Sequence, residues 1–176
     1  MARYNYDRLS DQDNNFLLWE RPGLPMHLAG LQIFKAGPLL NEHGGIDFDK
    51  VRKMTIATLH RVPRYRQKLA WVPRDERAVW VDDAHFNPDY HIRHTSLPRP
   101  GTDERLKSLM GRIMAQPLDR SKPLWELWVI EGLEGDRFAT ILKTHHCIID
   151  GSAGVDLASR LFSTDPDARI PKAPAF

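Results

Sequence analysis

The chain has 176 residues, of which 41% are hydrophobic and 27% charged, a size and composition typical of one globular domain with an ordinary core. Its 25 Lys and Arg side chains against 23 Asp and Glu leave a net charge of +2, too small to indicate a nucleic-acid-binding protein. The one cysteine, Cys147, has no partner for an internal disulfide, and no run of about 18 apolar residues is present that could span a membrane as a helix.

The first third of the chain predicts a short helix and then a strand. Ser10 precedes Asp11 and Asp13, a pattern typical of a helix N-cap with acidic groups near the positive end of the helix dipole. The Pro and Gly residues of 21–25 end this helix. Residues 26–34 alternate loosely and are apolar on both sides, so we expect a covered, interior strand of a sheet.

The middle of the chain predicts a second helix, a hairpin and a further strand. The helix begins at Asp47 or Asp49 and ends at Pro63, because apolar residues recur about one turn apart between them. This apolar stripe reaches Val62. Strands are expected at residues 68–73, 78–83 and 90–97, the first two paired as a hairpin.

The second half predicts a third helix, a second hairpin and a fourth helix. From Thr102 the apolar residues recur with helical spacing, and Pro117 closes the pattern. Strands are expected at residues 124–131 and 137–144, and another helix near Ser152. Together these elements predict an α/β or α+β fold with a mixed, mostly antiparallel sheet packed with helices.

Residues 144–151, with the sequence THHCIIDG, hold the side chains best suited to chemistry. Neighbouring side chains of an extended backbone point to opposite faces, so only one of His145 and His146 can face a small substrate. A neutral imidazole there can take a proton from an alcohol that attacks a carbonyl, and return it to the leaving group. Asp150 can orient the site, and Gly151 permits a close approach of ligand to backbone. Because no G-x-S-x-G nucleophile elbow is present, direct transfer without a covalent enzyme intermediate is the simpler chemistry.

Three other interpretations of this segment stay open from the residues alone. A His pair at the end of a strand is often purely structural. A metal site made of His145, His146 and Asp150 fits poorly because adjacent imidazoles diverge and no HExxH or paired-Cys spacing accompanies them, so no metal is expected. Cys147 is a conceivable nucleophile, although a lone cysteine among isoleucines is more often an inert apolar residue.

The string HHCIIDG matches the HHxxxDG motif of the CoA-dependent acyltransferases, a superfamily that includes chloramphenicol acetyltransferase, carnitine acyltransferases and the condensation domains of peptide synthetases. Two further regions narrow the resemblance. LSDQDNNFLLWE followed by PMHLAGLQIF, and PLDRSKPLWELWVIEGL with its PLW segment, resemble the bacterial wax ester synthase/diacylglycerol acyltransferase family. Three motifs in the same order, across residues 9–162, make this resemblance specific.

The resemblance implies a chloramphenicol acetyltransferase-like domain that transfers a long-chain acyl group from acyl-CoA to a fatty alcohol or diacylglycerol. His146 would be the general base and His145 a supporting residue. Asp150 would hold the loop in shape, and Gly151 would keep the substrate tunnel open. No cofactor is implied, because acyl-CoA is a co-substrate. Three further residues would lie near the acyl or acceptor channel: Pro123, Leu124 and Trp125.

Family members are longer than this chain and carry a second domain of similar fold. We therefore expect residues 1–165 to form an N-terminal acyltransferase domain and 166–176 to begin an inter-domain linker. The C-terminal half, fused or as a separate chain, is then an expected partner. We expect a cytoplasmic location, with peripheral contact to a membrane or lipid droplet through the basic residues of 61–68 beside Tyr65 and Trp71. A solvated basic helix end explains those residues equally well.

Two rival functions remain. One is a non-catalytic lipid-binding or interaction module of the same fold, which predicts acyl-chain binding that survives His146→Ala. The other is a condensation-type domain acting on carrier-protein thioesters, which predicts a preference for a carrier protein over free CoA.

Overall fold

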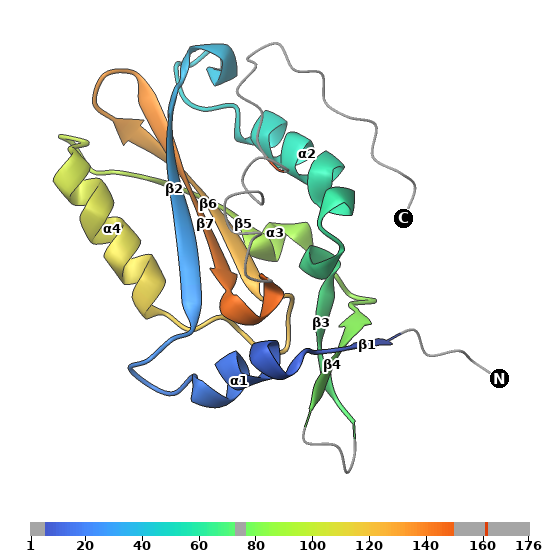
Figure 1. The fold of residues 1–176 in the computed structure, drawn as a ribbon. Helices are drawn as coiled ribbons and strands as arrows, with labels where there is room; N and C mark the ends of the chain where they lie inside the picture. The colour runs from blue at the N-terminus through green and yellow to red at the C-terminus, as the bar shows by residue number, and fades with distance from the viewer. Residues whose placement is uncertain (1–5, 73–76, 150–160, 162–176) are drawn as a thin grey trace.

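The computed structural model describes residues 6–72, 77–149 and 161, which form two sheets with helices packed around them (Figure 1). The larger sheet has the strand order β2-β7-β6-β5, and the smaller has the order β1-β4-β3. The strands are β1 Tyr6–Arg8, β2 His27–Lys35, β3 Gln67–Trp71, β4 Ala78–Asp82, β5 Ile92–Ser96, β6 Trp125–Leu133 and β7 Arg137–His145. The helices are α1 Asp11–Trp19, α2 Phe48–Thr58, α3 Pro88–His91 and α4 Asp103–Ala115.

The larger sheet is mixed and mostly antiparallel, as the sequence predicts. β7 pairs antiparallel with β2 and β6, whereas β5 runs parallel to β6. In the β2–β7 register His27 lies opposite His145. A residue near the start of the chain is thereby placed beside the predicted site.

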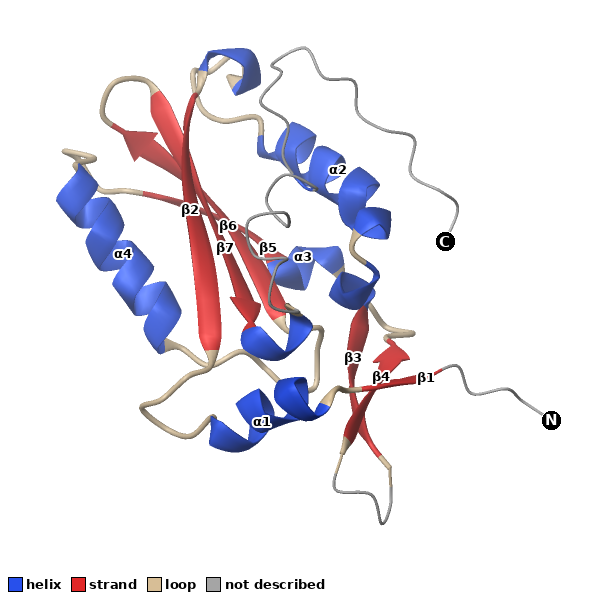
Figure 2. Cartoon of the chain, in the orientation of Figure 1, coloured by secondary structure: helices blue, strands red, loops and turns tan. Residues whose placement is uncertain are grey.

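Helices cover both faces of this sheet, α4 on one side and α2 on the other (Figures 1 and 2). Successive side chains of β7 alternate between the two sides, as the period of a strand requires. Ala139 and Ile141 pack in the cluster that contains Leu106 of α4, and Phe138 packs with Val51 of α2. The core therefore lies in two layers, one on each side of β7. The last residue of this strand, His145, is fully buried.

The expectation of an interior strand at residues 26–34 is wrong. Within the described chain β2 forms an edge of the larger sheet, and Ile33 is 44% exposed. Both of its faces are apolar because helices pack on both: Leu31 packs in the α4 cluster and Phe34 in the α2 cluster. Apolar residues on both faces therefore indicate covering layers rather than a central place in the sheet.

Two predicted boundaries also shift. The α-helix that begins after Asp47 ends at Thr58 instead of continuing to Val62, and 3-10 turns follow it. The hydroxyl of Thr58 donates to the carbonyl of Thr55 at 2.8 Å, and such bonds compete with regular helix geometry. The strand predicted from residue 90 begins only at Ile92, because the side chain of Asn87 caps the helical turn of α3.

The local signals are otherwise confirmed. Ser10 and Thr102 accept hydrogen bonds from backbone amides as N-caps of α1 and α4, and β3 pairs with β4 as a hairpin. Within the described ranges, no helix combines the length and apolar character needed to cross a membrane. The helix predicted near Ser152 and the linker of residues 166–176 lie outside the described residues.

We predict that Gly101→Ala destabilises the fold. A Cβ atom at this position would lie 1.7 Å from the carbonyl oxygen of Gly132, a backbone atom that cannot rotate away. The free energy of unfolding should fall by about 1–3 kcal/mol, as expected for overpacking, in urea denaturation followed by circular dichroism. Gly111→Ala in α4 is the matched control, since nothing lies within 4 Å of its Cβ position, and it should raise stability by about 0.5–1 kcal/mol. Equal stability of the two variants would contradict this packing.

Candidate active site

His145 is the last residue of β7 and His146 the first residue of the turn that follows, and their side chains contact different neighbours. The side chain of His145 is fully buried, and its Nδ1 accepts a hydrogen bond from the backbone N–H of Cys147 at 3.1 Å. The imidazole of His146 is only partly buried and stacks on Phe16 of α1, with 4.3 Å between ring centroids and 18° between planes. The chain turns sharply here through a 3-10 turn, His146–Ile148.

Two neighbouring segments hold the backbone of this turn. The N–H of His146 donates to the carbonyl of Met26 at 2.8 Å, just before β2. The N–H of His145 donates to the carbonyl of Leu124 at 3.0 Å, just before β6. The three strings that carry the family resemblance therefore meet at one point in space.

A buried carboxylate lies behind the His pair. Oε2 of Glu20 accepts hydrogen bonds from Nε and Nη2 of Arg120, at 3.1 and 2.8 Å, and Oε1 accepts one from the N–H of Met26 at 3.2 Å. Nε2 of His27 lies 2.9 Å from Oε1, and Nε2 of His145 lies 3.5 Å from Oε2. The exposed fraction of the Glu20 side chain is 10%, and those of both imidazoles are 0%.

The charges in this cluster follow from burial and hydrogen bonding. Burial alone would raise the pKa of Glu20, but the bonds from Arg120 and Met26 outweigh it and hold the pKa below its ordinary value. Burial lowers the pKa of His145 to about 4, despite the attraction of Glu20. Burial also lowers the pKa of His27. The cluster thus holds one carboxylate, one guanidinium and two neutral imidazoles near neutral pH.

Glu20, His27 and His145 carry ligand types that could hold a metal ion, and their ligand atoms lie within 4.8 Å of one another. The charge balance argues against one, because the guanidinium of Arg120 already compensates the only carboxylate of the set. A divalent cation would add two positive charges to a buried site with no further anion. The carboxylate already accepts three hydrogen bonds, two from Arg120 and one from Met26.

Cys147 lacks the features of a nucleophile. Its side chain is 2% exposed and packs in an apolar cluster with Leu9 and Trp80. Burial raises the pKa of the thiol well above its ordinary value, so the reactive thiolate is disfavoured.

Pro123, Leu124 and Trp125 lie in the core behind the site. All three are buried, and Leu124 and Trp125 are 0% exposed. The indole of Trp125 stacks on Tyr65, with centroids 4.5 Å apart, and its Nε1–H donates to the carbonyl of Tyr65 at 2.8 Å. Among the described residues this segment supports His145 through the Leu124 carbonyl, and its role in a channel stays a prediction.

The other predicted residues divide into two groups. Asp150 and Gly151 lie outside the described residues, so their roles stay predictions. The basic segment of residues 61–68, which was expected at a lipid surface, makes contacts within the fold. Tyr65 is 0% exposed, Arg64 pairs with Asp7, and Lys68 pairs with Asp83. Tyr65 therefore belongs to the core and does not face a membrane.

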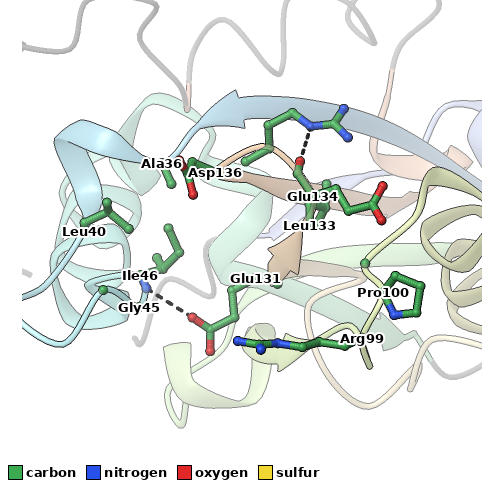
Figure 3. A pocket seen from close by; sticks show the side chains of 14 residues that line it. Ala36, Leu40, Gly45, Ile46, Arg99, Pro100, Glu131, Leu133, Glu134 and Asp136 are labelled. Atoms are coloured by element: carbon green, nitrogen blue, oxygen red, sulfur yellow. Dashed lines mark hydrogen bonds between the residues drawn. The ribbon is translucent and has the colours of Figure 1, made fainter.

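Figure 3 shows a pocket at the opposite end of the larger sheet, beside the turn between β6 and β7. Its volume is about 620 Å³. Glu131 reaches into it and accepts a hydrogen bond from the N–H of Ile46 at 3.1 Å. Because His145 and His146 lie at the other end of β7, this pocket is separate from the candidate site.

Sequence reasoning missed Phe16, Glu20, His27 and Arg120 as parts of the site. Glu20 and Arg120 are 100 residues apart in the chain, so no local spacing links them. The local sequence carried little signal, because Glu20 adjoins Arg21 and Arg120 lies next to Asp119.

The solved structures with similar folds define the class. A starter condensation domain of the rhizomide synthetase RzmA superposes with a TM-score of 0.64 at 13% identity, over 89% of this chain and 38% of that one. A wax ester synthase/diacylglycerol acyltransferase from Marinobacter aquaeolei VT8 superposes with a TM-score of 0.75 at 32% identity, over 95% of this chain and 40% of that one. The chain therefore shares its fold with a wax ester synthase/diacylglycerol acyltransferase and with condensation domains.

The sequence comparisons identify the family. A family model described as the wax ester synthase/diacylglycerol acyltransferase catalytic domain matches residues 9–175. A probable diacylglycerol O-acyltransferase of Mycobacterium tuberculosis, tgs3, is 39% identical over 145 residues, which are 82% of this chain and 52% of that protein. The chain belongs to the wax ester synthase/diacylglycerol acyltransferase family. It spans about half the length of this relative and 33% of another, a putative diacylglycerol O-acyltransferase of the same species.

The lowered pKa of His145 predicts acid sensitivity. In the unfolded chain the imidazole of His145 binds a proton near pH 6.5, whereas in the folded chain it does so only near pH 4. The free energy of unfolding therefore falls as the pH drops from 6.5 to about 4. A single such group contributes a slope of up to about 1.4 kcal/mol per pH unit. Urea denaturation at several pH values above 4.5, the ordinary pKa of Glu20, measures the slope before carboxyl protonation adds to it.

His145→Asn is the variant that tests this assignment. Its side-chain oxygen replaces Nδ1 as acceptor for Cys147 while the titrating group is removed. The slope should become smaller without vanishing, because burial also lowers the pKa of His27 and His91. An unchanged slope would show that His145 is not the group responsible.

Proposed function

We propose that this chain contributes the general base to an acyl-CoA-dependent O-acyltransferase that makes wax esters or triacylglycerol. The acyl group would pass from the thioester of acyl-CoA to the hydroxyl of a fatty alcohol or diacylglycerol. The observation that supports this most strongly is the placement of His146, in a family member, on a rigid turn at the end of β7 with its imidazole held against Phe16.

His146 is suited to the role of base by its surroundings. Its Nδ1 is buried without a hydrogen-bond partner among the described residues, so the hydrogen-bonding capacity of the ring is not consumed by the fold. Unsatisfied buried polar atoms are rare in folded proteins and are often associated with function. Nδ1 of His145, by contrast, accepts a hydrogen bond from Cys147, and the side chain is fully enclosed, although its Nε2 also lacks a hydrogen-bond partner among the described residues.

The proposed step conserves atoms and charge. The neutral imidazole of His146 takes the proton of the acceptor hydroxyl as the oxygen attacks the thioester carbonyl. The tetrahedral intermediate then breaks its C–S bond, and the imidazolium returns the proton to the departing CoA sulfur. An ester and free CoA result, and no acyl group is attached to the protein. Asp150 and Gly151 are proposed to shape the loop and the substrate tunnel beside His146.

Acyl-CoA is preferred over a carrier-protein thioester on the basis of the relatives. Relatives named as diacylglycerol O-acyltransferases share 35–39% of their residues with the aligned part of the chain, whereas the condensation domain shares 13% and supports only the fold. We infer no cofactor, since the transfer needs only the base and the two substrates.

The remaining substrate site is proposed to come from a C-terminal half, fused or separate. The chain corresponds to 40% of the Marinobacter enzyme, and residues 166–176 would begin the connection. We also infer peripheral contact with a membrane or lipid droplet in the cytoplasm. The apolar character of the proposed substrates supports this membrane contact. So do Leu18 and Trp19 at the end of α1, which are 63% and 57% exposed.

The first test is release of CoA from palmitoyl-CoA, with and without hexadecanol or diacylglycerol, by the chain together with its C-terminal half. His146→Ala should lower acceptor-dependent release by about 10²–10⁴-fold, the usual contribution of a general base. Assays with a carrier-protein thioester in place of palmitoyl-CoA test the condensation-type alternative.

Cys147→Ala is the matched control, and it should retain most of the activity because its buried thiol takes no part in the reaction. Loss of transfer in Cys147→Ala with full activity in His146→Ala would contradict the proposal. Binding of palmitoyl-CoA without any release in the wild type would favour the lipid-binding module instead.

A further inference from the structure

We infer that Glu20, held by Arg120, is the positioning residue that fixes His146 for proton transfer, because the two residues that accept hydrogen bonds from the N–H groups of His146 and Cys147 both contact its carboxylate. The inference rests on the proposed function, in which His146 is the base. Glu20 itself touches neither His146 nor any group proposed to react, so it acts through other residues.

The first step of the argument is that the peptide N–H groups on both sides of His146 are fixed. The N–H of His146 donates to the carbonyl of Met26 at 2.8 Å, and the N–H of Cys147 donates to Nδ1 of His145 at 3.1 Å. These two bonds set the direction in which the backbone leaves β7. They therefore determine where the imidazole of His146 lies.

The second step is that both acceptors depend on Glu20. The residue Met26 is also held at its own N–H, which donates to Oε1 of Glu20 at 3.2 Å. The far end of the His145 ring faces the same carboxylate, where Nε2 lies 3.5 Å from Oε2, an electrostatic contact rather than a hydrogen bond. The Glu20 carboxylate thus contacts both Met26 and His145, the residues that accept the two hydrogen bonds flanking His146.

The third step concerns the tautomer of His145. Nδ1 accepts a hydrogen bond from Cys147, so it carries no hydrogen. A neutral imidazole then carries its hydrogen on Nε2, the atom that faces the Glu20 carboxylate. The negative charge favours this orientation of the ring, as carboxylates do for histidines in other sites.

The fourth step extends the account to the ring of His146. Nη2 of Arg120 donates to the carbonyl of Leu17 at 2.8 Å as well as to Glu20, and the N–H of Glu20 donates to the carbonyl of Phe16 at 3.2 Å. These bonds fix the end of α1, from which Phe16 stacks on His146. The pair Glu20–Arg120 therefore supports the imidazole as well as the backbone of His146.

The position of Glu20 and Arg120 allows either residue to be substituted and its role tested. Glu20 and Arg120 line a pocket of about 490 Å³ between the segment that follows α1 and the end of α4. Other lining residues include Pro25 and Pro117. The pair lies at the wall of this pocket rather than sealed in the core, so a change of charge need not abolish folding.

The experiment compares Glu20→Gln with Glu126→Gln. Both glutamates have mostly buried side chains, 10% and 11% exposed, and both pair with an arginine, Arg120 at 2.8 Å and Arg93 at 3.1 Å. Only Glu20 connects to the His146 turn. The readouts are the thermal midpoint, kcat and KM for palmitoyl-CoA, and the ¹⁵N resonances of the His145 ring in the full protein.

Glu20→Gln should lower kcat on the order of 10²-fold, the scale expected for misplacement of a catalytic group by about 1 Å, while KM for palmitoyl-CoA stays near the wild-type value. In the wild type the His145 ring should show the Nε2–H tautomer, and its resonances should shift in Glu20→Gln because the amide NH₂ opposes this orientation. Glu126→Gln should lower the thermal midpoint to a similar degree and change neither kcat nor the His145 resonances.

Equal effects of the two variants on kcat would overturn the inference. So would a His145 ring whose resonances are the same in Glu20→Gln and the wild type. A stoichiometric metal ion whose removal by a chelator shifts those resonances would overturn it as well, in favour of a metal site on Glu20, His27 and His145. If the wild type transfers no acyl group, the proposed function fails, and the resonances still decide whether Glu20 orients His145.

Discussion

The ion pair between Glu20 and Arg120 joins the segment that follows α1 to the segment that follows α4, at the point where β2 and β7 also meet. Glu20 follows α1, Arg120 follows α4, and the carboxylate also contacts the start of β2 and the end of β7. A mostly buried carboxylate is costly unless it is paired and fully hydrogen-bonded, and here four nitrogen-bearing groups surround it. Meeting that requirement brings together the three sequence motifs that define the family.

The same constraint explains the different roles of two adjacent histidines. His145 is drawn into the interior by the alternation of β7 and remains neutral because burial lowers its pKa. His146 follows on the turn and keeps a ring nitrogen without a partner among the described residues. Among the described residues, buried His145 lies beside His146 in the chain, Phe16 stacks on its ring, and Nδ1 makes no hydrogen bond, which suits the proposed role of general base.

Local chemistry was predictable from the sequence, and long-range contacts were not. The cap at Ser10 depends on a residue three positions away, so the sequence alone predicted it. The edge position of β2 was not predictable, because helices far along the chain cover both of its faces. His146, the proposed general base, was singled out by a motif of seven residues. Its support by Glu20 was missed, because Arg120 and His145 lie 100 and 125 positions away and no periodicity connects them.

The most direct test of the central claim, direct transfer assisted by His146, is a single turnover with radiolabelled palmitoyl-CoA and hexadecanol. The full protein is quenched at successive times, and label is measured both in the ester and on the protein. The account predicts that label passes to the ester without appearing on the protein. It also predicts that His146→Ala forms ester far more slowly. Label bound to the protein before ester appears, on Cys147 or on any other side chain, would contradict direct transfer.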